Sequence, residues 1–219
     1  MFDLTNPTDH SKYSITSPQF WWQRHELYQL WINLPSSEKM SEPSIQLLSD
    51  ESDTPLVEDR QNGSVVRVLA GKYLEHESTA PLSTEMLVLH VHLDKGKRWT
   101  CPLSKDFETC FLYMRQGSLT CNPEEEKEPI PPHYTAFFSP TGDSLVLQAT
   151  ENADFMLLAG VPLREPCVSQ GSMVMTSKAE INQAYMDYQS GLFGQPWDHK
   201  LSREEWKEHV RKFPTSRYS

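Results

Sequence analysis

The chain has 219 residues, of which 37% are hydrophobic and 23% are charged, as is typical of a soluble globular protein. Its formal net charge of −10 disfavours direct binding to nucleic acid, because an acidic surface repels phosphate. No apolar run approaches the roughly 20 residues that span a membrane, and the first residues do not resemble a signal peptide. The four cysteines show no C-x-x-C spacing and are expected to be reduced and mostly buried, so we expect a cytoplasmic and/or nuclear protein.

Short apolar runs recur about every ten residues along the chain, and turn residues separate them. The runs are residues 28–34, 65–70, 86–93, 109–114, 118–121, 134–138, 144–149 and 154–159. The separators DKGK, RQGS, SPTGD and ENAD carry Gly, Pro, Asp or Asn. This rhythm predicts an all-β barrel or jelly roll, since βαβ units need longer helical spacers. Residues 48–63 and 122–132 show no period and are expected to be exposed loops.

Two helices are predicted near the end of the chain. Ser177 and Glu180 form a capping box before the first, and Gly191 stands where its C-terminal cap belongs. The apolar stripe of this helix is expected at Ile181, Ala184, Tyr185 and Tyr188. Ser202 and Glu205 form a second capping box, whose helix has Trp206, Val210 and Phe213 on its apolar edge.

The stretch LVLHVHLDKG, residues 87–96, contains a His-x-His pair, a pattern that begins many metal sites. In a strand, neighbouring side chains point to opposite faces, and a small barrel must fill its interior with apolar groups. The expected inner set is Leu87, Leu89, Val91 and Leu93, and the expected outer set is Val88, His90, His92 and Asp94. The pair is therefore expected on the solvated outer face, with an adventitious surface zinc as the alternative. That face is also a candidate for packing against a partner domain.

Two long stretches closely resemble the pirin family. QLWINLPSSEKMSEPSIQ, residues 29–46, is similar to the segment in which pirins pass from their first cupin domain to their second. LLAGVPLREPCVSQGSMVMTSKAEINQAYMDYQSGLFG, residues 157–194, is similar to the end of the C-terminal cupin domain. Between them, LHVHLDKG and EPIPPHYTAFF match two strands of the family in order. With the predicted helices, the resemblance implies an all-β fold: a cupin-type jelly-roll barrel with two C-terminal helices.

The resemblance covers about residues 28–194 and implies a domain division. Residues 1–27 are expected to be an N-terminal arm, a remnant of or replacement for the N-terminal cupin. An inter-domain crossing strand and linker at 28–47, a pirin C-terminal cupin domain at 48–194, and a helix and tail at 195–219 are expected to follow. Of the adjacent Trp21 and Trp22, either one covers apolar surface left bare by the absent domain, or both lie in a poorly ordered arm.

Pirins hold a mononuclear iron in their N-terminal cupin domain, through a His-x-His pair and a later His-x-Glu. His10 matches one histidine of this set, but Lys12 stands where the glutamate would be, and a protonated lysine cannot bind iron. The corresponding positions of the second cupin fall near Pro102, Ser104 and Cys110, which is not an iron ligand set. We therefore expect no cofactor and no catalytic residue, with His10, His90 and His92 as the remaining candidates for a metal ligand. His133, beside two prolines, is interpreted as structural.

By resemblance, the expected function is that of a non-catalytic cupin protein that binds other proteins, similar to the pirins implicated as transcription cofactors. The expected partner is another protein or a second copy, bound through an exposed inter-domain face, without direct nucleic-acid or membrane binding. The alternative is a truncated form of an iron-dependent quercetin 2,3-dioxygenase-type pirin. That chemistry needs an iron with open positions for substrate and dioxygen.

Overall fold

The computed structural model describes residues 26–41, 43–48, 50–121, 128–139 and 141–193, and a few single positions between 202 and 212. These residues divide into two compact units. Residues 26–32 and 45–162 belong to the first, and residues 33–44 and those from 163 onward belong to the second. Within the described part of the chain, no helix is long and apolar enough to cross a membrane.

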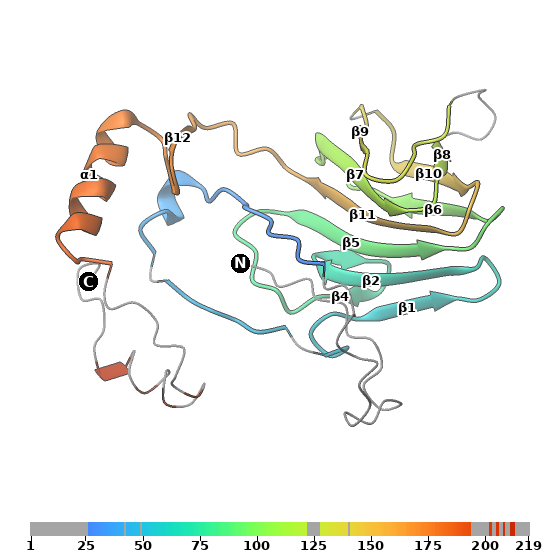
Figure 1. The fold of residues 1–219 in the computed structure, drawn as a ribbon, viewed down its shortest axis with the longest axis horizontal. Helices are drawn as coiled ribbons and strands as arrows, with labels where there is room; N and C mark the ends of the chain where they lie inside the picture. Colours follow the sequence, from blue (N-terminus) through green and yellow to red (C-terminus); the bar gives the residue numbers. More distant parts are fainter. Residues whose placement is uncertain are drawn as a thin grey trace, which may run out of the picture. The chain divides into compact units, whose positions relative to one another are not determined.

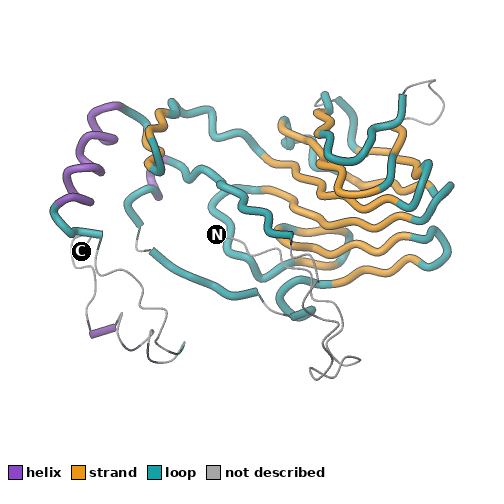
Figure 2. Tube along the Cα trace, viewed as in Figure 1, coloured by secondary structure: helices purple, strands orange, loops and turns teal. Residues whose placement is uncertain are grey.

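The first unit consists of antiparallel sheets (Figure 1). The six-stranded sheet contains, in order, β1 (Leu56–Asp59), β2 (Ser64–Ala70), β5 (Met86–Leu93), β11 (Ala153–Gly160), β7 (Thr109–Gln116) and β9 (Thr135–Phe137). The three-stranded sheet contains, in order, β6 (Arg98–Pro102), β10 (Ser144–Ala149) and β8 (Leu119–Cys121). A small hairpin joins β3 (Lys72–Tyr73) to β4 (His76–Glu77). Most connections are short, as Figure 2 shows by colour, and the predicted all-β class is confirmed.

The inner faces of the two larger sheets share one apolar core. Trp99 of β6 makes an edge contact with Phe155 of β11, with ring centroids 5.7 Å apart. The indole N–H of Trp99 donates to the Tyr73 hydroxyl at 3.0 Å, so the one polar atom of this large ring is satisfied. Cys110 lies in the core and Cys121 packs against it, as predicted, whereas Cys167 is exposed.

Most predicted strands are confirmed, but two strands of the larger sheets, β1 and β6, were missed, as were the short strands of the small hairpins. Residues 48–63 are not a plain loop, because β1 lies within them and pairs with β2. This strand is a short edge strand with two acids, and its sequence therefore carries a weak pattern. β6 has only two buried residues, Trp99 and Cys101, which alternate with the exposed Arg98, Thr100 and Pro102. Two buried positions next to a charged turn do not form an apolar run, so this strand was missed.

The predicted strand at residues 28–34 is wrong, since the structure assigns no strand there. The alternation itself is nevertheless visible: Tyr28, Leu30 and Ile32 are half-buried, whereas Gln29 and Trp31 are exposed. Tyr28 and Leu30 contact the first unit with their side chains, and the segment does not pair with the sheet as a strand.

The second unit contains a 3-10 helix η3 (Ser36–Glu38), a hairpin of β12 (Val168–Gln170) and β13 (Met173–Met175), and α1 (Lys178–Gln189). The predicted capping box is present: Glu180 N–H donates to Ser177 Oγ at 3.3 Å, and Ser177 Oγ donates to the Glu180 carboxylate at 2.9 Å. Gly191 follows the helix with φ of 74°, a left-handed conformation that glycine adopts without strain. Ile181 is buried, but Tyr188 is 62% exposed, so the predicted stripe is wrong at its last residue.

The second predicted helix lies mostly outside the described residues. Its capping box is described: Ser202 N–H donates to Glu205 Oε2 at 2.7 Å, and Glu205 N–H donates to Ser202 Oγ at 3.3 Å. Glu205, Glu208, Arg211 and Lys212 are helical. The predicted apolar edge at Trp206, Val210 and Phe213 lies outside the described residues.

Candidate functional site

The inner face of β5 matches the prediction. Its four inward side chains, Leu87, Leu89, Val91 and Leu93, are at most 2% exposed and belong to the main core. His90 and His92 point to the opposite face, as expected from the strand's period of two. The aliphatic half of the His-x-His stretch therefore serves to fill the core.

The outer face of β5 is not the solvated surface that was predicted. Val88 is only 5% exposed and forms a second, smaller apolar cluster with Ala70, Ala80 and Met156. Leu30 of the preceding segment and the half-buried Tyr113 pack against this cluster. The sheet is therefore covered on part of both faces, and the outer side combines an apolar patch with a polar one.

The polar part of the outer face is centred on Arg115, near the end of β7. Arg115 Nη1 donates to Asp154 Oδ1 of β11 at 2.7 Å, and Arg115 Nη2 donates to Glu26 Oε2 at 2.8 Å. Arg115 Nε donates to the same Glu26 oxygen and to the Tyr28 hydroxyl, each at 3.2 Å. The Arg115 side chain is only 11% exposed. One guanidinium thus joins two strands of the sheet to the segment at residues 26–28.

His90 completes this cluster from β5. Its Nε2 lies 2.9 Å from Asp154 Oδ1 and 2.8 Å from Arg115 Nη1. A single nitrogen cannot serve both neighbours at once: with a proton it donates to Asp154, and without one it accepts from Arg115. In either state His90 supports the pair of Arg115 and Asp154, so this imidazole already has a structural role.

The electrostatics follow from this geometry. Burial alone would raise the pKa of Asp154, but its hydrogen bonds and attraction to His90 and Arg115 outweigh burial, and the pKa is lowered. Hydrogen bonds from Arg115 and then Tyr28 lower the pKa of Glu26. The cluster therefore holds two carboxylates ionised around one guanidinium at neutral pH.

The other histidines that were singled out do not join this cluster. His92 is nearly half exposed, and its Nε2 lies 3.8 Å from Asp94 Oδ1. His133 is exposed with φ of 68°, and its backbone N–H donates to the Met114 carbonyl at 2.7 Å. His10, Trp21 and Trp22 lie outside the described residues.

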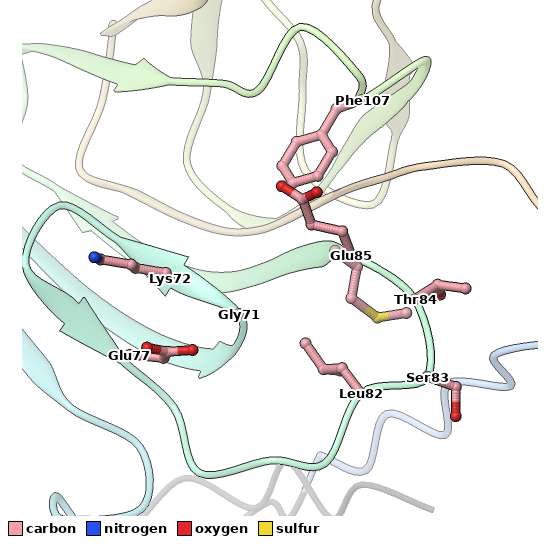
Figure 3. Close-up of a pocket in the computed structure, with 9 residues that line it drawn as sticks. Gly71, Lys72, Glu77, Leu82, Ser83, Thr84, Glu85 and Phe107 are labelled. Carbon is pink, nitrogen blue, oxygen red and sulfur yellow. The ribbon is translucent and has the colours of Figure 1, made fainter.

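A hollow of about 410 Å³ opens beside the β3–β4 hairpin (Figure 3). Lys72 and Glu77 face each other across the hairpin, and Leu82, Thr84 and Glu85 line the hollow from the loop before β5. Phe107 borders it from a different loop. Its rim carries charges of both signs, from Lys72, Glu77 and Glu85.

Comparisons with known proteins agree with this fold. Residues 88–194 match the pirin C-terminal cupin domain. The chain is 36% identical over 168 residues to pirin from Homo sapiens, which covers 76% of this chain and 56% of that protein. Pirin-1 from Arabidopsis thaliana is 35% identical over 169 residues, covering 76% of this chain and 57% of the relative. The chain therefore contains a pirin C-terminal cupin domain at residues 88–194, and its sequence is similar to pirins over about three quarters of its length.

A solved structure gives the same result for the cupin fold of this chain. The crystal structure of quercetin 2,3-dioxygenase from Acinetobacter baumannii matches with a TM-score of 0.69 and 31% identity. It covers 75% of this chain and 56% of that chain. The predicted cupin jelly roll is thereby confirmed, and the chain spans only slightly more than half the length of these relatives.

In the described cupin unit, the positions that the resemblance assigned to metal ligands do not carry the residue types that hold iron in the family. Of the positions that the resemblance assigned to ligands, Pro102 is exposed at a strand end, and Cys110 is only 4% exposed in the core. Burial raises the pKa of the Cys110 thiol to about 11. Among the described residues, no group of three or more His, Cys, Asp or Glu side chains is placed to hold a metal ion.

Sequence reasoning missed Arg115 and Asp154, the two central residues of the outer cluster. The signal that could have found Arg115 was the alternation of side chains between the two faces of the strand. Arg115 shares a face of its strand with Phe111 and Tyr113, opposite the buried Leu112 and Met114. Glu26 lay outside every predicted element, and nothing in its neighbourhood indicated an arginine partner nearly 90 residues later.

Proposed function

We propose that this chain acts as a non-catalytic protein-binding module, similar in role to a transcription cofactor. The single observation that supports this most is the contrast between its two faces. The inward positions are occupied by packed apolar side chains. On the outer face, by contrast, Arg115 pairs with Asp154 of the sheet and also binds Glu26 of an extended segment. A surface that already binds an extended segment is suited to binding proteins.

Exposed apolar side chains on the first unit support the same proposal. Leu27, Trp31, Tyr134 and Phe137 are each at least 60% exposed. Exposed apolar groups on proteins often mark interaction sites, and a two-fold dimer would cover such groups on both copies. We expect this chain to self-associate or to bind a protein partner through this side.

The metal content tests the non-catalytic part of the proposal. The full chain, purified without added metal, is expected to contain much less than one iron per chain by elemental analysis. Finding one iron per chain that is lost on His90→Ala and His92→Ala substitution would overturn both the proposal and the structural role of His90. Light scattering over a range of concentrations tests association, and a clean monomer that binds no apolar dye would contradict it.

The alternative is a partial quercetin 2,3-dioxygenase, and the observation that favours it is the 31% identity to the Acinetobacter baumannii enzyme. The test is to add Fe(II) and quercetin to the full chain under air and to follow loss of quercetin. Under the proposed function, the rate equals that of Fe(II) alone. A rate that depends on the protein and saturates with quercetin would replace our proposal with the enzymatic one.

A further inference from the structure

The guanidinium of Arg115 is positioned by the sheet itself. Asp154 of β11 and His90 of β5 both contact Nη1, at 2.7 and 2.8 Å, and both come from strands of the same sheet as Arg115. None of these contacts requires the segment at residues 26–32. The arginine is therefore held in place before any further group binds, and a preorganised arginine fork loses little entropy when it meets a carboxylate.

The other side of the guanidinium, Nε and Nη2, faces Glu26. Two residues further along, the centroid of the Tyr28 ring lies 5.5 Å from Arg115 Cζ. The same ring makes an edge contact with the Tyr113 ring, with the two centroids 5.8 Å apart. Two residues beyond, Leu30 packs against the outer apolar cluster. Alternate side chains of an extended segment thus contact three separate subsites: a cation, an aromatic surface and an apolar patch.

Within the described part of the chain, side chains make the contacts that hold this segment to the sheet. Among the described residues, no backbone hydrogen bond joins residues 26–32 to the sheet, and the segment is not a strand. The Glu26 side chain is 45% exposed, whereas the Arg115 side chain that binds it is 11% exposed. An arginine that its own sheet positions, and that holds a half-buried segment through side chains, is an arrangement that permits exchange.

We propose that the outer face of β5, β11 and β7 is a receptor for an extended peptide of a partner protein, with a glutamate, a tyrosine and a leucine at alternate positions. Residues 26–30 occupy the receptor in this chain, and the partner peptide displaces them. The inference deepens the proposed protein-binding function and rests on it. The ligand's chemistry is defined by the segment now seated there: a carboxylate for the guanidinium, an aromatic ring for Tyr113 and an aliphatic group for the patch.

The test uses the full chain in an opened form, Glu26→Gln with Tyr28→Ala, which weakens the internal segment without touching the receptor. The matched control is Leu27→Ala with Gln29→Ala, because both of these side chains are exposed on the opposite side of the segment. Circular dichroism and thermal unfolding confirm that both variants are folded. The probe is a fluorescein-labelled peptide ELYQLWI, the sequence of residues 26–32, and binding is followed by fluorescence anisotropy.

We expect the peptide to bind the opened form at least about tenfold more tightly than wild type or the control, because the internal segment competes at high effective concentration. A peptide with glutamine in place of its glutamate should bind the opened form about fivefold more weakly, since the charge-assisted bonds to Arg115 are lost. Arg115→Lys in the opened form should weaken binding similarly, because lysine cannot form the fork.

A folded opened form that does not bind the peptide would overturn the proposal, as would equal binding of the glutamine version. A concentration-dependent dimer of wild type that the peptide disperses would support the receptor and identify a second copy as its partner. The result is separable from the broader function. Stoichiometric iron or quercetin turnover would remove the non-catalytic role while peptide binding persisted, whereas failed peptide binding with observed association would remove only this receptor.

Discussion

The two faces of β5 show two different ways in which one strand contributes to a protein. The inner face contributes four aliphatic side chains to a single continuous core, where they are at most 2% exposed. The outer face contributes Val88 to a small apolar cluster and His90 to a charged one, and leaves His92 exposed. The inner face depends on the hydrophobic effect over a large area, whereas the outer face depends on a few specific pairings.

This difference has an energetic consequence. A core of many similar contacts tolerates changes of shape better than it tolerates a charge, since no partner for a charge exists within it. A cluster of charges tolerates loss of an outlying member, but loss of its central member leaves buried groups without partners. Substitutions on the two faces should therefore differ in how much they lower the free energy of unfolding, and in whether a second substitution can restore it.

The largest expected effect is that of Leu89→Asp on the inner face. Leu89 is fully buried, and a carboxylate there has no partner, so the cost should exceed about 4 kcal/mol and unfold the unit. On the outer face, His90→Ala removes one hydrogen bond of a half-buried group and should cost about 1 kcal/mol. Urea unfolding followed by circular dichroism measures both, and equal damage would mean that the faces are assigned the wrong way round.

A smaller effect is expected for Arg115→Met, which removes the centre of the outer cluster. Asp154, whose side chain is only 21% exposed, then loses its guanidinium partner, at a cost of about 2–3 kcal/mol in the free energy of unfolding. Adding Asp154→Leu should recover most of this loss, because no unpaired carboxylate remains. If the double variant is as unstable as the single one, the arginine contributes through packing rather than through charge.

The inner face could be predicted from the sequence because its pattern is local. Leu87, Leu89, Val91 and Leu93 alternate without interruption, and a small jelly roll has one interior to fill. The capping box at Ser177 and Glu180 could be predicted for the same reason, since both partners lie within one turn. Short-range patterns of this kind depend on neighbours that the sequence itself displays.

The outer cluster could not be predicted, because its members come from distant parts of the chain. Glu26, His90, Arg115 and Asp154 meet only through the order β5-β11-β7 and the register of those strands. The outer face was predicted to be solvated because His90 and His92 are polar, but Val88 and Met156 on the same face are covered by the segment at Leu30. Polarity alone thus does not show whether a face is covered.

The next largest effect on stability is expected in the segment that covers the outer face. Leu30→Ala should cost about 1 kcal/mol, because the half-buried side chain packs on the cluster of Val88 and Met156. Leu27→Ala, at a side chain that is 71% exposed, should stay within about 0.5 kcal/mol. Thermal unfolding of the two variants separates them, and a silent Leu30→Ala would mean that the segment adds no stability to the sheet.

The smallest expected effect is the pH dependence of the contact between Glu26 and Arg115. Because the folded-state pKa of Glu26 is lowered, its contribution is complete above the pKa of an unfolded glutamate, about 4.3, and is lost as the pH falls through the lower folded value. The pair is solvent-exposed on the Glu26 side, so the contribution at neutral pH should be no more than about 1 kcal/mol. The difference in unfolding free energy between wild type and Glu26→Gln should therefore be constant from pH 7 to about pH 5 and shrink towards zero below about pH 4. Added salt should reduce the same difference at neutral pH, since exposed charges are screened. A difference that persists unchanged at pH 3 would mean that Glu26 holds the segment by packing and not by its charge.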